Sequence, residues 1–176
     1  MTTEKMPESS ARPGEIHGID GDLPEGKVVI VASRYNAAIC DALVDGAKQT
    51  ILDAGYPEHL IPIVRVPGAW ELPTVVRTTI DDEEVVGVIA LGCVIKGETT
   101  HDEHINRAVS TSLMDLAMES GIPIGFGVLT CNTQAQAEAR AAQPDQKEGA
   151  VGNKGIEAAN AVLELLRLNQ KLASEV

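Results

Sequence analysis

One stretch decides the fold: Leu91-Gly92-Cys93-Val94-Ile95-Lys96-Gly97-Glu98-Thr99-Thr100-His101-Asp102-Glu103-His104. It begins as an apolar, β-branched strand, which the run Lys-Gly-Glu-Thr-Thr ends abruptly. Thr100 and Glu103 have the spacing of a capping box, which predicts a helix with His101 in its first turn. The positive end of the helix dipole disfavours an imidazolium there, so we expect a neutral imidazole. A titratable ring beside unpaired backbone N–H groups indicates a reaction site for an anionic substrate.

Four apolar runs predict the strands of one sheet. Residues 28–32 are continuously apolar, which is typical of a strand buried on both faces. The run 60–66 contains Pro62, which favours an edge strand. The remaining predicted strands are 85–95 and 122–129.

Helical periods fill the gaps between these strands. Apolar stripes over 39–54 and 105–117 predict two helices that end at Gly55 and Gly121. A shorter helix is predicted over 75–80 and a last one over about 153–168. Alternating strands and helices predict an α/β fold with a parallel sheet and helices on both faces. The apolar stripe of the last helix is wider than one sheet face needs. Burial against another subunit and a merely wide core stripe both account for it.

The length of 176 residues suits one domain with a substantial core. Residues 1–26 are rich in Pro, Gly, Ser and Glu without a helical or strand period, so we expect a flexible N-terminal segment. The expected α/β domain spans residues 27–176. Because only 2% of the residues are aromatic, Val, Ile, Leu and Ala must build its core.

Charge and cysteine content exclude several classes of function. The formal net charge of -12 argues against nucleic acid or an anionic membrane as a main partner. Only 3 cysteines occur, without a C-x-x-C pair, so neither a disulfide framework nor a zinc ribbon is indicated. The first residues lack the apolar core of a signal peptide, and no apolar run has membrane-spanning length. We therefore expect a cytoplasmic protein.

The few aromatic residues gather where ligands bind to parallel sheets, beyond the carboxyl ends of the strands. Tyr35 and Trp70 follow the first two predicted strands, and Phe126 lies between two glycines of the last one. This placement suggests a platform for a flat heterocycle, on which stacking contributes about 1 kcal/mol beyond burial. The alternative is that these rings are ordinary core side chains.

Two further interpretations compete at the strand-to-helix junction. His101 is either a proton-transfer residue or a solvated histidine near a helix cap. A metal cluster of His101, Asp102, Glu103 and His104 is disfavoured, because adjacent helical residues point in different directions. Lys96 at the strand end could form a Schiff base, but such a lysine is more often a solvated charge.

Taken together, five ordered motifs resemble those of the 6,7-dimethyl-8-ribityllumazine synthases of riboflavin biosynthesis. They are Ser33-Arg34-Tyr35-Asn36, Val66-Pro67-Gly68-Ala69-Trp70-Glu71-Leu72-Pro73, the run 91–101, Phe126-Gly127-Val128-Leu129-Thr130 and Gly152-Asn153-Lys154-Gly155. The resemblance extends from about Lys27 to Leu168. It implies a three-layer flavodoxin-like sandwich with a four-stranded parallel sheet. It also implies condensation of 5-amino-6-ribitylaminouracil with 3,4-dihydroxy-2-butanone 4-phosphate, without a metal or an organic cofactor.

The resemblance implies roles for the residues of the first two motifs and for the histidine. His101 would be the proton-transfer residue. Tyr35 would stack on the pyrimidine ring, where the family usually has Phe or Trp. Ala69, Trp70 and Glu71 would line the ribityl chain, with Glu71 accepting hydrogen bonds from its hydroxyls.

Backbone groups would make the other contacts of the same subunit. Cys93, Val94 and Ile95 would present theirs to the pyrimidine edge. Glu98 and Thr99 would donate N–H groups to the phosphate.

The resemblance also implies that neighbouring subunits share each site. Phe126 and Arg140 would enter from the adjacent subunit, and Arg140 would pair with the phosphate. The connection over 141–151 is longer than is usual in the family, so Lys147 is given no role. Lengthened connections resemble those of free pentamers, which predicts a homopentamer, with a sixty-subunit icosahedral shell as the alternative.

Two other functions stay open on the sequence. A non-catalytic flavin or lumazine carrier could use the same pocket, since such folds host many functions. Retention of both His101 and Arg140 favours the enzyme, because a riboflavin carrier needs no phosphate clamp. A metal-dependent hydrolase using His101 and His104 is the third possibility.

Overall fold

A four-stranded parallel sheet organises the chain. The computed structural model describes residues 14–143 and 151–174. The strands are β1 (Lys27–Ser33), β2 (Ile63–Val66), β3 (Val85–Ile95) and β4 (Ile124–Cys131). Their order is β2-β1-β3-β4, and every neighbouring pair is parallel. The bounds predicted for β3 are confirmed, and β2 is the predicted edge strand.

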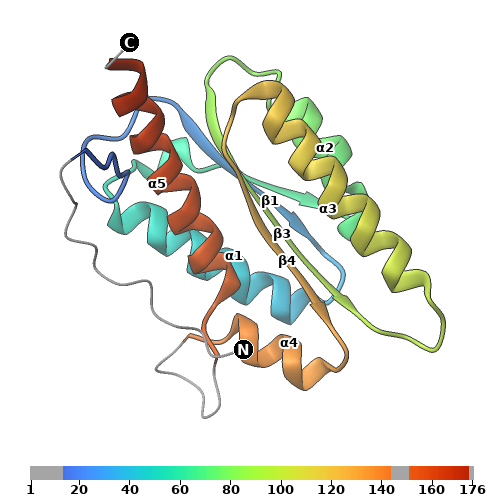
Figure 1. Ribbon diagram of the computed structural model, residues 1–176. Helices are drawn as coiled ribbons and strands as arrows, with labels where there is room; N and C mark the ends of the chain where they lie inside the picture. The colour runs from blue at the N-terminus through green and yellow to red at the C-terminus, as the bar shows by residue number, and fades with distance from the viewer. Residues whose placement is uncertain (1–13, 144–150, 175–176) are drawn as a thin grey trace.

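Helices cover both faces of this sheet (Figure 1). On one face lie α1 (Ala37–Asp53), α4 (Gln134–Ala141) and α5 (Lys154–Ser174), and on the other α2 (Leu72–Thr79) and α3 (His101–Ser120). Two short 3-10 helices, η1 (Glu58–Leu60) and η2 (Ala69–Glu71), flank β2. The predicted three-layer, flavodoxin-like α/β fold is confirmed.

The two central strands, β1 and β3, have apolar side chains on both faces, which explains why they lie in the middle of the sheet between two helical layers. In β1, Ile30 packs with the α1 and α5 side of the core, whereas Val31 packs with the α2 and α3 side. In β3, Ile89 and Ala90 divide between the same two clusters. Because successive side chains of a strand point to opposite faces, an uninterrupted apolar run fills both cores at once.

Some predicted element ends were wrong. Strand β2 begins only at Ile63, because Leu60, the first residue of the predicted run, ends the short helix η1. Strand β4 begins two residues later than predicted and ends at Cys131. Helix α5 continues beyond Leu168 to Ser174. Most of its apolar stripe is core, but Leu165 is 43% exposed.

Residues 14–26 form no helix or strand and lie against α5. The ammonium group of Lys171 donates to the carbonyl of His17 at 2.7 Å and pairs with Asp20 at 2.5 Å. Hydrogen bonding and the charge of Lys171 lower the pKa of Asp20. Residues 1–13 of the expected flexible segment lie outside the described residues. Within the described part of the chain, no helix has the length and apolarity to cross a membrane.

Helices α1 and α5 pack closely together at Gly155. A Cβ atom at this position would lie 2.0 Å from the backbone oxygen of Leu43. That oxygen belongs to a buried helix and cannot yield as a flexible side chain could. Glycine is therefore required here by packing rather than by backbone conformation.

We expect Gly155→Ala to lower the free energy of unfolding by about 2 kcal/mol, because it forces the two helices apart. Gly97→Ala is the matched control, since a Cβ at Gly97 meets nothing within 4 Å. Urea unfolding followed by circular dichroism compares the two variants with the parent chain. Equal stability of both variants would contradict this account of the helix contact.

Candidate active site

A pocket of about 370 Å³ opens at the carboxyl ends of β1 and β3. The strand order reverses between these two strands, and such a point is where open α/β sheets bind ligands. The residues that line it are Tyr35, Gly68, Ala69, Trp70, Cys93, Val94, Ile95, Gly97, Thr99, His101, Asp102 and Ile105. Eight of the twelve predicted site residues are among them. The other four are Glu71, Glu98, Phe126 and Arg140.

Tyr35 is placed by the end of the β1–β2 ladder. Its backbone N–H lies 3.1 Å from the carbonyl of Pro67 and 3.1 Å from the hydroxyl oxygen of Ser33. The side chain is 72% exposed although its backbone is anchored. The ring is thus presented at the pocket and is not packed in the core.

Asn36 joins the first loop to the central strand. It adopts a left-handed conformation with φ 57, which Asn tolerates better than most residues. Its side-chain amide donates to the carbonyl of Cys93 at 2.9 Å. Asn36 was not predicted to have a separate role, although an Asn at a strand-to-helix turn is the signal that could have indicated one.

The second loop presents Trp70. Helix η2 carries this indole, which is 58% exposed. The carboxylate of Glu71 accepts the backbone N–H of Gly68 at 2.8 Å, which stabilises the loop that leads into η2. Glu71 does not line the pocket in the described structure. The alternative interpretation of Tyr35 and Trp70 as core side chains is wrong, because both rings are exposed.

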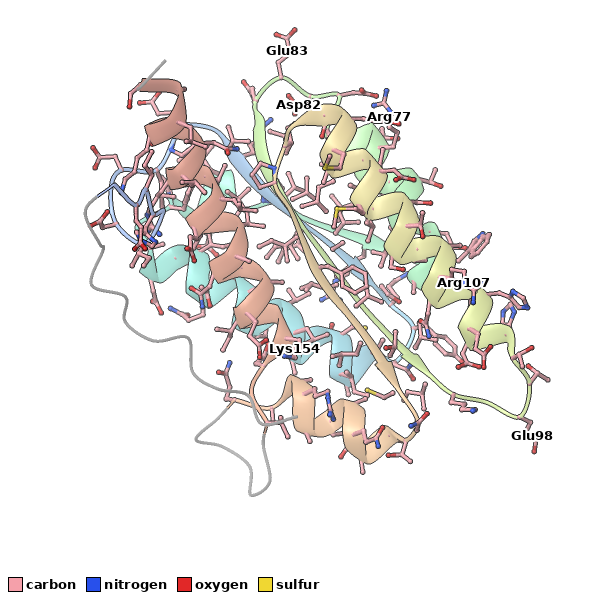
Figure 2. All side chains as sticks on the ribbon, viewed as in Figure 1. Arg77, Asp82, Glu83, Glu98, Arg107 and Lys154 are labelled. Carbon is pink, nitrogen blue, oxygen red and sulfur yellow. The ribbon has the colours of Figure 1, made fainter. Side chains whose placement is uncertain are left out.

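The loop between β3 and α3 brings in the histidine. His101 begins α3 and so lies in its first turn, as predicted, but the predicted capping box was wrong. The Thr100 side chain makes no capping hydrogen bond, and the N–H of Glu103 lies 3.1 Å from the Thr100 carbonyl. The Thr99 hydroxyl instead accepts the N–H of His101 at 3.4 Å. The side chain of Glu98 points away from the molecule at the tip of this loop (Figure 2).

Asp102 lines the pocket but was not among the predicted substrate-binding residues. It lies on the inward stripe of α3 that continues through Asn106, Val109 and Leu113, and this spacing is the signal that could have found it. Within the described residues, one carboxylate oxygen of Asp102 and the amide oxygen of Asn106 are buried without a hydrogen-bond partner. Asp102 therefore brings a partly buried carboxyl group to the lining of the pocket.

Two other predicted alternatives find no support in this arrangement. Lys96 is exposed and does not line the pocket, which makes it a solvated charge rather than a desolvated nucleophile. Across residues 14–143 and 151–174, no group of three His, Cys, Asp or Glu side chains could hold a metal ion.

Phe126 and Arg140 lie away from this pocket on the same chain. Phe126 is 49% exposed and lines a separate groove of about 570 Å³ between α3 and α5. The same groove contains the exposed side chains of Met114, Met118 and Leu165. Arg140 is half-buried on α4, where its guanidinium donates to the carbonyl of Gln136 at 3.1 Å. One chain does not bring these two residues to His101.

Comparison with known proteins gives one consistent family. The family model described as 6,7-dimethyl-8-ribityllumazine synthase matches residues 25–170. A protein of that name from Rhodopirellula baltica is 58% identical over 157 residues, which cover 89% of this chain and 97% of the relative. Proteins of the same name from Xylella fastidiosa and Xanthomonas campestris are each 43% identical over 155 residues, covering 87% of this chain and 97% of each relative.

The three cysteines are buried, and Cys93 among them lines the pocket. Burial raises the pKa of the Cys93 thiol to about 12 and that of Cys40 to about 11, and it also raises the pKa of Cys131. The sulfur of Cys40 donates to the carbonyl of Tyr35 at 3.2 Å. These groups stay protonated at neutral pH, so they are apolar filling and not nucleophiles.

The raised thiol pKa values predict a loss of stability in alkali. The unfolded thiols release their protons near the ordinary value of 9.0, whereas the folded ones retain them to about 11 and 12. The free energy of unfolding should therefore fall as the pH rises from about 9 toward 11. Urea unfolding across this range tests it, with the double variant Cys40→Ala/Cys93→Ala expected to show a shallower pH dependence. An unchanged slope in the double variant would show that other groups cause the effect.

Proposed function

The chain belongs to the 6,7-dimethyl-8-ribityllumazine synthase family, and we propose that the pocket beside His101 is where it carries out that family's reaction. The chain is a transferase of riboflavin biosynthesis. It condenses 5-amino-6-ribitylaminouracil with 3,4-dihydroxy-2-butanone 4-phosphate to give 6,7-dimethyl-8-ribityllumazine. The amine and the ketone form an imine with loss of one water, phosphate is then eliminated, and ring closure with loss of a second water completes the product.

One observation carries the assignment of the site: two exposed aromatic rings and a histidine at a helix start line the same pocket. The rings of Tyr35 and Trp70 offer flat apolar surface to a pyrimidine, with Tyr35 stacking on it and Trp70 beside the ribityl chain. The strand end over 93–95 offers backbone donors and acceptors to the edge of the pyrimidine, as the ends of parallel strands commonly do.

The phosphate is assigned to the loop that precedes α3. The first N–H groups of a helix have no partner within the helix and attract anions. Gly97 and Thr99 line the pocket, and the outward direction of the Glu98 side chain leaves its backbone N–H as the group that contributes.

Positioning supplies most of the catalysis in this scheme. The pyrimidine brings its own amine nucleophile, so the protein mainly holds the amine and the ketone in contact. His101 accepts and returns the protons that imine formation and phosphate departure move. Glu71 is assigned to the ribityl hydroxyls through the part of its carboxylate that Gly68 does not use.

A second copy of the chain completes the site in this proposal. Phe126 and Arg140 come from the neighbouring subunit, because Phe126 lines the separate groove between α3 and α5 and Arg140 lies on α4, away from the pocket of its own chain. The exposed apolar groove around Phe126, Met114 and Met118 supports an interface at this face. We propose a homopentamer, with an icosahedral shell of sixty subunits as the alternative. Residues 144–150 of the lengthened connection lie outside the described residues.

We place the enzyme in the cytoplasm. Its three cysteines are free thiols in the described structure, as expected for a reducing compartment.

The experiment that tests the function mixes both substrates with the purified chain and follows lumazine fluorescence and released phosphate. Equal amounts of the two products, at a rate well above that without protein, support the enzyme. Binding of lumazine or riboflavin without turnover would instead identify the carrier. Full activity after exhaustive chelation separates the enzyme from a metal-dependent hydrolase.

We expect His101→Ala to lower kcat by a factor between about 10 and 10⁴, the range for loss of a proton-transfer group. Binding of the pyrimidine substrate should change little, since the rings and the strand end remain. His104→Ala is the matched control, because His104 lies in the same helical turn but does not line the pocket. An unchanged kcat for His101→Ala would remove the proposed role.

Arg140→Ala should raise KM for the butanone phosphate by about 10-fold or more, because a charge-assisted contact with the phosphate is lost. KM for ribitylaminouracil should stay nearly unchanged. Steady-state kinetics with each substrate varied in turn give both values. Equal weakening of both substrates would contradict a phosphate contact by this residue.

A further inference from the structure

Asn153 is a buried polar side chain whose hydrogen-bonding capacity is fully used. The residue is 2% exposed. Its amide nitrogen donates to the carbonyl of Ala141 at 2.6 Å and to that of Ala42 at 3.0 Å. Its amide oxygen accepts the N–H groups of Gly155 at 2.8 Å and Ile156 at 3.2 Å. Both donors and both acceptor sites therefore have partners.

These four bonds connect three helices at one point. Ala42 belongs to α1, Ala141 ends α4, and Gly155 and Ile156 begin α5. The Asn153 side chain is tightly packed, because a Cβ atom added at Gly46 would lie 2.8 Å from its amide oxygen. Part of the Gly-Asn-Lys-Gly motif is thereby explained as a packed corner. Lys154 marks this corner at the start of α5, next to α4 (Figure 2).

Hydrogen bonds hold both ends of α4 in the described part of the chain, and Ala141 at its last turn is also buried in the core. Thr133 caps the opposite end of the helix, where its hydroxyl accepts the N–H of Gln136 at 3.2 Å. Near the end itself, the N–H of Val151 donates to the carbonyl of Ala139 at 2.9 Å. The 2.6 Å bond from Asn153 to Ala141 lies one residue beyond Arg140. This bond therefore helps to fix the last turn of α4, which carries Arg140.

We propose that Asn153 is a positioning residue for Arg140, and through it for the phosphate of the butanone substrate. The inference rests on the proposed function, in which Arg140 binds that phosphate in the neighbouring subunit's pocket. Asn153 itself touches no substrate. It sets the angle of the last turn of α4, and a misplacement of about 1 Å in a binding group can cost up to about 10²-fold in rate.

The two ends of the amide have separable roles. The oxygen caps α5, which Asp does equally well. The nitrogen holds Ala141 and Ala42, which a carboxylate oxygen would repel because carbonyl oxygens are also acceptors. Asn153→Asp therefore retains the cap and removes the connection to α4. It distinguishes positioning of Arg140 from simple stabilisation of α5.

Steady-state kinetics of Asn153→Asp, Arg140→Ala and the double variant test the proposal. We expect Asn153→Asp to raise KM for the butanone phosphate about 10-fold, with KM for ribitylaminouracil changed by less than about 2-fold. In the Arg140→Ala background, Asn153→Asp should not raise KM for the butanone phosphate further, because Asn153 acts on the phosphate only through Arg140. Should Asn153→Asp fail to fold, Asn153→Ser replaces it as a capping residue without the amide donor.

Leu163→Ala is the control for a purely structural effect. This substitution removes a buried apolar side chain of α5 and breaks no hydrogen bond to α4. It should therefore lower Tm and leave the ratio of the two KM values unchanged. Additive KM effects in the double variant, or equal rises in both KM values for Asn153→Asp, would overturn the proposal. An Arg140→Ala variant with unaltered KM for the phosphate substrate would overturn it together with the role of Arg140. Lack of turnover by the parent chain would instead refute the proposed function.

Discussion

The pairing of β3 with both β1 and β4 is the constraint on which the rest of the structure depends. Because β3 has apolar side chains on both faces, it is stable only between two helical layers, with strands on either side. Parallel pairing then brings the carboxyl ends of the strands to one edge of the sheet. The loops after β1, β2 and β3 meet there although they are far apart in the sequence, and the pocket forms where they meet.

The loops that form the pocket have anchored backbones and exposed aromatic side chains. Asn36 and the backbone contacts of Tyr35 fasten the first loop to β3 and β2, and Glu71 fastens the second through Gly68. The rings that these loops present are nevertheless exposed. Anchored backbone with exposed aromatic side chains is an arrangement that a ligand or a second subunit can complete. The family reaction, in which a flat pyrimidine meets a small phosphoester, requires such a surface.

Sequence patterns predicted the fold well because local apolar runs decide it. The bounds of β3, the edge position of β2 and the ends of α1 and α3 before Gly55 and Gly121 were confirmed. Features that depend on competing or distant partners were not predictable in this way. At the start of α3, the hydroxyl of Thr99 and not that of Thr100 accepts a backbone N–H. The hydrogen bond from Asn153 to Ala42 joins residues far apart in the sequence, so it forms only in the folded chain. Asp102 was missed because its neighbours His101 and Glu103 suggested capping and proton transfer instead.

The central claim is that two chains build each site, with His101 from one and Arg140 from the other. Subunit mixing tests it most directly: His101→Ala and Arg140→Ala proteins are unfolded and refolded together, then assayed at a low concentration of the butanone phosphate. If sites are shared, random assembly of equal amounts restores about a quarter of the sites. Activity should then rise well above the sum of the two variants refolded separately. Activity that never exceeds this sum, in samples whose mass confirms mixed oligomers, would contradict a shared site.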